Sequence, residues 1–195
     1  MKRFVQFLGA ATLLLSFTQC SGDATTDSAP SVQGSVKLTA SINETRTELS
    51  GNDVLWKSND CLGLFCGTKF VNAPFTTTAG GTTSADFTGD PTDPSGSEAE
   101  VFYAYYPYSA HAVLEGSVVS GLSIPAVQTF ATKSFATELC PMATSGADYS
   151  RLAFRTIGTV LKFQVTGQKN VTKIELTGNN GEALAGDYTI DFVGE

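Results

Sequence analysis

The residues of this chain that could perform covalent or acid–base chemistry are few and scattered. Its 195 residues include four cysteines and a single histidine, His111. Hydrolases need a nucleophile in a recognisable local context, and metal sites need several ligands gathered together. The sequence has no Gly-x-Ser-x-Gly motif and no phosphate-binding glycine loop, and no cluster of ligand-type residues lies near His111. The scattered carboxylates give no positive support to a glycosidase pair. We therefore predict no enzyme activity, no catalytic residue, no metal site and no cofactor, and we expect His111 at the surface.

One cysteine stands where a lipid could be attached. After a basic start, an apolar run from Phe4 to Phe17 is too short to span a bilayer but is typical of a signal peptide. Cys20 follows it and resembles the acylated cysteine of a bacterial lipobox. We expect residues 1–19 to be a lipoprotein signal peptide and residues 20–34 a flexible tether to an acylated Cys20. The alternative is ordinary signal cleavage that leaves Cys20 as a free thiol.

Composition determines which kind of scaffold can position these residues. Only 16% of residues are charged, 19 are glycines, and short apolar segments alternate with stretches rich in Thr, Ser and Gly. This pattern favours short strands joined by turns over helices. The net charge is −7 and no basic cluster follows residue 3, so nucleic acid is a poor candidate partner.

The clearest element is an alternating segment near the start of the expected domain. From Ser35 to Ile42 the apolar residues fall on one face, which predicts a half-buried strand. Its apolar face comprises Val36, Leu38, Ala40 and Ile42. Short apolar segments follow at Val54–Trp56 and Cys61–Phe65, and the aromatic segment lies at Val101–Tyr108. Further strands are expected at Ala85–Phe87, 121–125, Arg151–Ile157, Thr159–Thr166, Val171–Leu176 and Tyr188–Val193. Residues 76–99 are expected to form loops around Ala85–Phe87, and residues 130–150 to be irregular. Such strands predict an all-β domain, a β-sandwich of about seven to ten strands.

An aromatic segment, Val101–Tyr108, stands at the centre of the sequence. Alternation would place Phe102, Ala104 and Tyr106 on one face, with Tyr103 and Tyr105 on the other. These tyrosines, Tyr108 and Trp56 could stack on a sugar if exposed, but we favour core and rim positions for them.

Three cysteines besides Cys20 remain to be placed. Cys61, Cys66 and Cys140 are odd in number, so at most one disulfide forms among them. Cys61 and Cys66 flank an apolar stretch, which favours small core residues on one β-segment. A bridge between these two within one strand would require a sharp turn at Gly63.

An ordered set of motifs resembles the fimbrillin family of the Bacteroidales, including the Mfa-like proteins. The motifs lie within residues 35–192 and are Thr45-Arg46-Thr47, Trp56-x-x-x-Asp60-x-x-Gly63-x-Phe65, Ala104-Tyr105-Tyr106-Pro107-Tyr108, Ile124-Pro125-x-x-Gln128-Thr129 and Leu152-x-Phe154. The sequence departs from the family at Asn59, where a glycine is common, and at Thr156, where a histidine is common.

The resemblance implies two transthyretin-like, immunoglobulin-like β-sandwich domains in a lipoprotein carried to the outer membrane surface. It also implies cleavage after an arginine by a trypsin-like protease, followed by polymerisation with other pilin subunits through donor-strand exchange. We expect residues 35–195 to be the N-terminal domain. The chain stops at Glu195, where the second domain would be expected to begin, so we expect a fragment, a truncated reading frame or a one-domain relative.

Transferred to this sequence, cleavage would take place between Arg46 and Thr47 and would separate the strand that carries Val36, Leu38, Ala40 and Ile42. Arg46 as a solvated turn residue is the simpler alternative. The predicted function is a structural or adhesive fimbrial subunit. The alternative is a monomeric, lipid-anchored β-sandwich that binds glycan or host ligand without polymerising.

In the tether, Asp27-Ser28-Ala29 resembles an O-glycosylation acceptor of Bacteroidetes, with Ser28 as the modified residue.

Overall fold

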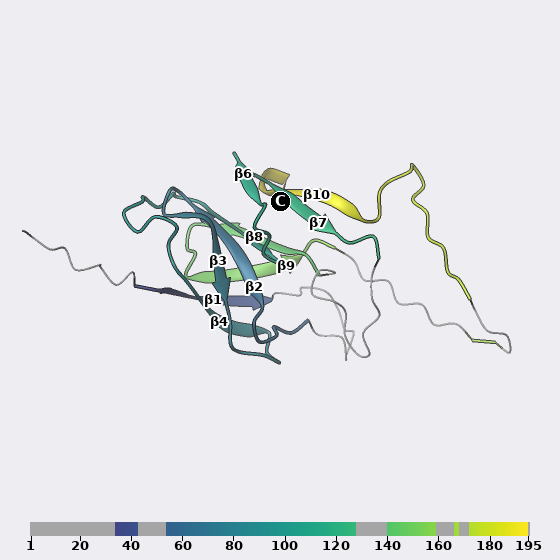
Figure 1. Cartoon of the computed structure of the whole chain (residues 1–195), viewed down its shortest axis with the longest axis horizontal. Coiled ribbons are helices and arrows are strands. Elements are labelled where there is room, and N and C mark those ends of the chain that lie inside the picture. Colours follow the sequence, from purple (N-terminus) through teal and green to yellow (C-terminus); the bar gives the residue numbers. More distant parts are fainter. Residues whose placement is uncertain (1–33, 43–53, 128–139, 159–165, 168–171, 195) are drawn as a thin grey trace, which may run out of the picture. The chain divides into compact units, whose positions relative to one another are not determined.

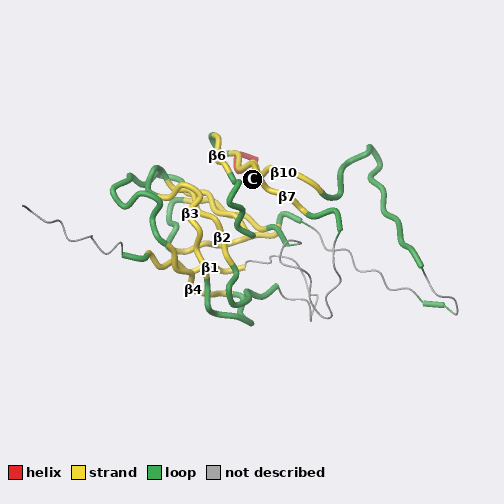
Figure 2. The backbone as a smooth tube through the Cα atoms, in the orientation of Figure 1, coloured by secondary structure: helices red, strands yellow, loops and turns green. Residues whose placement is uncertain are grey.

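Strands that are far apart in the sequence pair edge to edge into a closed barrel in the computed structural model, which describes residues 34–42, 54–127, 140–158, 166–167 and 172–194. Figure 1 shows these strands and Figure 2 the loops between them. In barrel order the strands are β1 (Val36–Ile42), β4 (Ser84–Gly89), β3 (Phe70–Thr76), β2 (Cys61–Cys66), β5 (Phe102–Tyr106), β8 (Met142–Gly146) and β9 (Arg151–Thr156). The prediction of an all-β domain is confirmed.

The barrel consists of two well-paired groups of strands that are joined by two short seams. In the first group, β1 pairs antiparallel with β4 over six residue pairs and parallel with β9 over four. The second group has the order β3-β2-β5-β8. Only Thr76 and Thr88 pair between β3 and β4, and two residue pairs join β8 to β9. The ladder therefore closes on itself, whereas the predicted sandwich would keep its two sheets apart.

The barrel interior is filled by every second side chain of these strands, as the pleat of a strand requires. Trp56 lies near the middle and is fully buried, with edge-to-face contacts to the rings of Phe87, Tyr106 and Phe154 at centroid distances of 5.0, 5.3 and 5.7 Å. Around it pack apolar side chains from all seven strands, including Leu38, Leu62, Phe75, Ala104, Met142 and Leu152.

A second sheet covers the outer side of β2, β5 and β8. It has the order β10-β7-β6, with β6 at Val113–Glu115, β7 at Val118–Ile124 and β10 at Gly186–Asp191, followed by the short 3₁₀ helix η2 at Phe192–Gly194. Its buried side chains Val119, Leu122 and Ile190 pack in one cluster with Phe65, Tyr105 and Ala143 of the barrel. β5 is consequently buried on both sides. The predicted division of its side chains is confirmed, since Phe102, Ala104 and Tyr106 face the interior and Tyr105 the outer cluster.

Several predicted elements differ from the structure. β3, β6 and β8 were not predicted as strands, and β8 lies inside the stretch expected to be irregular. Conversely, residues 172–176 have no strand structure, so the prediction of a strand at Val171–Leu176 is wrong for them. The other predicted strand of that region, Thr159–Thr166, lies outside the described residues except for Thr166. No helix in the described part of the chain is long and apolar enough to cross a membrane.

Candidate functional site

The predicted site residues divide into two groups in the structure. Cys20, Ser28, Arg46 and Thr47 lie outside the described residues, as do the predicted signal peptide and nearly all of the tether. The four residues of the predicted displaced strand are described and form the buried face of β1. We therefore take β1 and its surroundings as the candidate functional site.

β1 is enclosed on both edges and on one face. Its backbone is hydrogen-bonded toward both neighbouring segments, with Thr39 N–H donating to Ser150 O and Ile42 N–H donating to Thr83 O, each at 2.9 Å. Leu38 is 1% exposed and Ala40 is fully buried, while Ile42 lies in the same core cluster. Loss of this strand would open the edges of both β4 and β9 and uncover the apolar interior between them.

Polar contacts on the outer face of β1 hold it to β4. Lys37 Nζ lies 2.8 Å from Asp86 Oδ2, and the Thr39 hydroxyl donates to Asp86 Oδ1 at 2.9 Å. The hydrogen bonds from Lys37 and Thr39 lower the pKa of Asp86 below its ordinary value. The stabilisation from these contacts is present at neutral pH and is lost as the pH falls through the lowered pKa. Because the pair is exposed to solvent, its contribution is small.

A side chain from outside the strand also holds β1, and sequence reasoning missed this role. The indole N–H of Trp56 donates to the carbonyl oxygen of Ala40 at 3.1 Å, inside the barrel. Trp56 itself is fixed by two backbone hydrogen bonds to the segment that precedes β4, since its N–H donates to Thr82 O at 2.9 Å and its carbonyl oxygen accepts from Gly81 N–H at 2.8 Å. The sequence shows Trp56 but does not show that Ala40 of β1 is its hydrogen-bond partner, because that contact depends on the tertiary structure.

Replacing Trp56 by phenylalanine is expected to destabilise the protein by about 1–3 kcal/mol, because the buried Ala40 carbonyl loses its indole donor. Amide hydrogen exchange in β1 should accelerate more than exchange in β5. Phe154→Leu is the control, since it alters a ring packed on Trp56 but leaves the indole donor in place. Equal acceleration of both strands in both variants would contradict a specific role of the Trp56 hydrogen bond.

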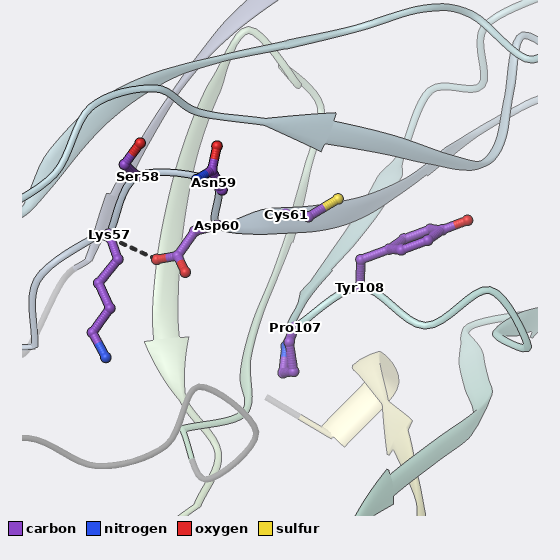
Figure 3. Close-up of a pocket in the computed structure, with 7 residues that line it drawn as sticks. All are labelled: Lys57, Ser58, Asn59, Asp60, Cys61, Pro107 and Tyr108. Atoms are coloured by element: carbon purple, nitrogen blue, oxygen red, sulfur yellow. Dashed lines mark hydrogen bonds between the residues drawn. The ribbon is translucent and has the colours of Figure 1, made fainter. Parts of the chain in front are cut away.

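A second feature is a pocket of about 300 Å³ beside the turn that precedes β2 (Figure 3). It is lined by Lys57, Ser58, Asn59, Asp60, Cys61, Pro107 and Tyr108. The Asp60 carboxylate is buried and accepts hydrogen bonds from Lys57 N–H at 2.7 Å and from the Tyr106 hydroxyl at 2.9 Å. Asn59 has a φ of 71°, a left-handed conformation that asparagine tolerates in turns. Asp60 thus organises the turn from within, and it is already bonded to protein groups.

The thiol at this pocket has its ionisation suppressed. Burial raises the pKa of Cys61, and the nearby Asp60 raises it further. A protonated thiol is a poor nucleophile. The pocket therefore offers polar groups and the ring of Tyr108 for binding a ligand, and the Cys61 thiol adds no activated nucleophile to it.

The cysteines are expected to react slowly in the folded protein. Cys61 and Cys66 are free thiols, and burial raises the pKa of both. Alkylation by iodoacetamide at pH 8 should therefore be at least about tenfold slower at Cys61 and Cys66 than in the urea-unfolded chain. Peptide mapping by mass spectrometry measures both rates. Equal rates in folded and unfolded protein would show that these thiols are accessible and ionised.

The aromatic residues that could have stacked on a sugar lie in the core or at its rim, as expected. Trp56, Tyr105 and Tyr106 are buried, so they form no platform for a sugar, and Tyr103 and Tyr108 are half-buried. His111 is exposed, as expected. Within the described residues there is no group of three or more potential metal ligands.

Comparisons with known proteins add no further assignment. No family model, no curated protein and no solved structure matches this chain.

Proposed function

We propose that this chain is a surface lipoprotein of the fimbrillin type, a structural or adhesive subunit of fimbriae. In this proposal a trypsin-like protease cuts between Arg46 and Thr47 and removes β1, and a strand from another subunit takes its place. The observation that supports it is the position of β1 between β4 and β9, with Leu38, Ala40 and Ile42 in the core. Arg46 follows the end of this strand by only four residues.

The groove that removal of β1 would leave between β4 and β9 favours an extended strand as its ligand. Removal of β1 would expose unpaired N–H and C=O groups on β4 and β9 along the length of the strand. An extended peptide that adds to such edges gains main-chain hydrogen bonds, and its alternate side chains fill the apolar pockets. The pockets here are those that Leu38, Ala40 and Ile42 fill, so the incoming strand should carry apolar residues at every second position.

The layering of the strands supports a transthyretin-like or immunoglobulin-like sandwich as the underlying fold. The groups β4-β1-β9 and β3-β2-β5-β8 each pair over several residues, whereas one or two residue pairs join them at each seam. We interpret the barrel as a sandwich whose two sheets meet at their corners. In such a sandwich, exchange of β1 would disturb one sheet and leave the other intact.

Anchoring and export form the second part of the proposal. Acylation at Cys20 would hold the precursor on the outer membrane, with residues 20–34 as a spacer that carries the candidate O-glycosylation site Ser28. Two or more acyl chains give stable membrane attachment, whereas a single chain gives marginal attachment.

The cleavage step is tested by intact-mass and N-terminal mapping of protein from the outer-membrane fraction, with and without a trypsin-like protease. We expect treated protein to begin at Thr47 and to form oligomers that resist SDS. Arg46→Ala should abolish both changes. Arg155→Ala, on the exposed face of β9, is the control and should behave as the native protein. If Arg46→Ala leaves both the mature mass and the oligomeric state unchanged, the proposal fails.

The pocket beside β2 supports a second candidate function. A volume of about 300 Å³ lined by Lys57, Ser58, Asn59 and Tyr108 could receive one small polar group, such as a sugar ring. In this alternative the chain is a lipid-anchored monomer that binds glycan or host ligand. Protein that stays acylated at Cys20 and monomeric after protease treatment would favour it over the fimbrial subunit.

A further inference from the structure

The outer sheet has an open edge at β10. The order β10-β7-β6 places β10 at one side, and within the described residues it pairs only with β7. The extra residue of this ladder lies on β7, so β10 carries no bulge from Gly186 to Asp191. Tyr188 and Ile190 face the apolar cluster, so Asp187, Thr189 and Asp191 lie on the opposite, solvent-facing side. An open edge of this kind can accept another strand.

A segment with the properties of a strand precedes β10 and has no strand partner among the described residues. Residues 172–185 contain neither helix nor strand before β10 begins (Figure 1). Ile174 and Leu176 are each 50% exposed. Lys173 Nζ lies 2.8 Å from Glu175 Oε2, a contact between alternate residues. One side of this segment is therefore apolar and exposed, and the other carries an ion pair.

We propose that Thr172–Thr177 of one copy of this chain pairs antiparallel with the β10 edge of a second copy, in a reciprocal exchange that forms a dimer. The register that we infer places Ile174 opposite Ile190 and Leu176 opposite Tyr188. Lys173 then lies opposite Asp191, and Glu175 lies opposite the uncharged Thr189. The apolar sides of both strands fall on the same face of the extended sheet.

Other registers are disfavoured by charge and by polarity. A slip by one residue would turn Lys173 and Glu175 toward the apolar face of the sheet. A slip by two residues in either direction would place Glu175 opposite Asp187 or Asp191, and like charges directly opposite destabilise a strand pair. Pairing of two β10 strands about Thr189 would also place Asp187 opposite Asp191. Asp187 and Asp191 thus disfavour the shifted registers and the pairing of two β10 strands. Asp191 favours the register in which it lies opposite Lys173.

Exchange between copies agrees with the exposure of the segment, which has no strand partner among the described residues of the single chain. A reciprocal exchange is closed by twofold symmetry, so it ends at a dimer. It does not depend on removal of β1, and it is tested on the full chain with Arg46 uncleaved. Failure of this pairing would therefore leave the proposed cleavage at Arg46 untouched.

The first test measures oligomeric state by sedimentation velocity over a wide range of protein concentration. We expect the native chain to form a dimer, and Ile174→Asp to raise the dimer dissociation constant at least about tenfold, because it buries an unpaired carboxylate against Ile190. The matched control is Val113→Asp on β6, since Val113 is 51% exposed and Ile174 50%. A native chain that stays monomeric, or equal effects of both variants, would overturn the proposal.

The second test exchanges the charges of the inferred ion pair. Lys173→Asp and Asp191→Lys should each be monomeric alone, because each homodimer would oppose two like charges at both exchanged strands. An equimolar mixture should form a heterodimer, because both exchanged strands then have opposite charges. Dimer formation by each single variant alone would contradict the register. If the double variant alone regains protection of residues 172–177 from hydrogen exchange as a monomer, the segment pairs with its own β10 and the proposal is wrong.

Discussion

A monomeric chain that begins at Thr47, with no strand from another subunit in place of β1, is expected to lose its folded state. A synthetic peptide that spans residues 34–45 is expected to restore it. Leu38 and Ile42 each contribute about 1.5–3 kcal/mol through burial, and β1 also supplies the ladders to β4 and β9. A domain is stable by only about 5–15 kcal/mol in total, so the loss of this strand removes a large part of that margin. The peptide restores the same contacts without the covalent link.

The tryptophan fluorescence of the chain itself measures this refolding. Trp56 is its single tryptophan, and its indole N–H bonds to Ala40 of β1. Refolding should therefore shift the tryptophan emission to shorter wavelength as the peptide closes the barrel over the ring. The control peptide carries Leu38→Ser and Ile42→Ser, which keep length and charge but remove the buried side chains. A chain from Thr47 that stays monomeric with unchanged emission would show that β1 is dispensable, and strand exchange would then have no structural basis.

The alternation of the sequence was sufficient to place the strands whose faces differ in polarity. β1 was predicted with the correct division of side chains, because burial of one face leaves a period of two in the sequence. β5 is buried on both faces, and its side chains were divided correctly by the alternation of the pleat alone. The all-β class followed from the same signals. Alternation does not show where a ladder ends. The closure of the barrel depends on the single pair Thr76–Thr88 at one seam and on two residue pairs between β8 and β9 at the other.

The strands that were missed depend on their neighbours for their structure. β3 contains Asn72 with a φ of 50° and Pro74, both of which weaken a strand signal. Asn72 is held by tertiary contacts, since its side-chain oxygen lies 2.6 Å from the Tyr105 hydroxyl. β8 is short and partly polar and pairs with β5 along its length. Residues 172–176 show the converse, because a good alternating pattern forms no strand without a ladder.

The candidate site was predictable to a similar extent. The buried face of β1 was correct in all four residues, since Leu38, Ala40 and Ile42 are buried and Val36 packs against the same core. The central position of β1 was not predictable, because its parallel partner β9 lies more than a hundred residues further along the chain. Long-range parallel pairing leaves no local signal in the sequence. The Trp56 hydrogen bond to Ala40 also leaves no local signal, because it depends on the tertiary packing of the indole against β1.

Gly63→Ala is expected to destabilise the domain by about 3 kcal/mol or more, at the upper end of the cost of overpacking a core. Gly63 lies in the middle of β2 and pairs with Tyr105 on β5 and with Pro74 on β3. A Cβ atom on Gly63 would lie 2.5 Å from Cζ of the Tyr105 ring, closer than such atoms approach one another. Urea unfolding measures the loss of free energy.

The ring cannot withdraw, because contacts on several sides fix Tyr105. It is fully buried, stacks on Phe65, and its hydroxyl donates to Asn72 Oδ1 at 2.6 Å and accepts from Ser109 N–H at 3.2 Å. The control is Gly146→Ala on β8, whose Cβ would lie 3.2 Å from the Phe102 ring and requires only a small adjustment. In a Tyr105→Leu background the cost of Gly63→Ala should fall by more than half, because the shorter side chain vacates the space. If the cost is the same in both backgrounds, Gly63 is required for another reason. A reduced cost would identify the contact between Gly63 and Tyr105 as the close approach that joins β2 to β5 beneath the outer sheet.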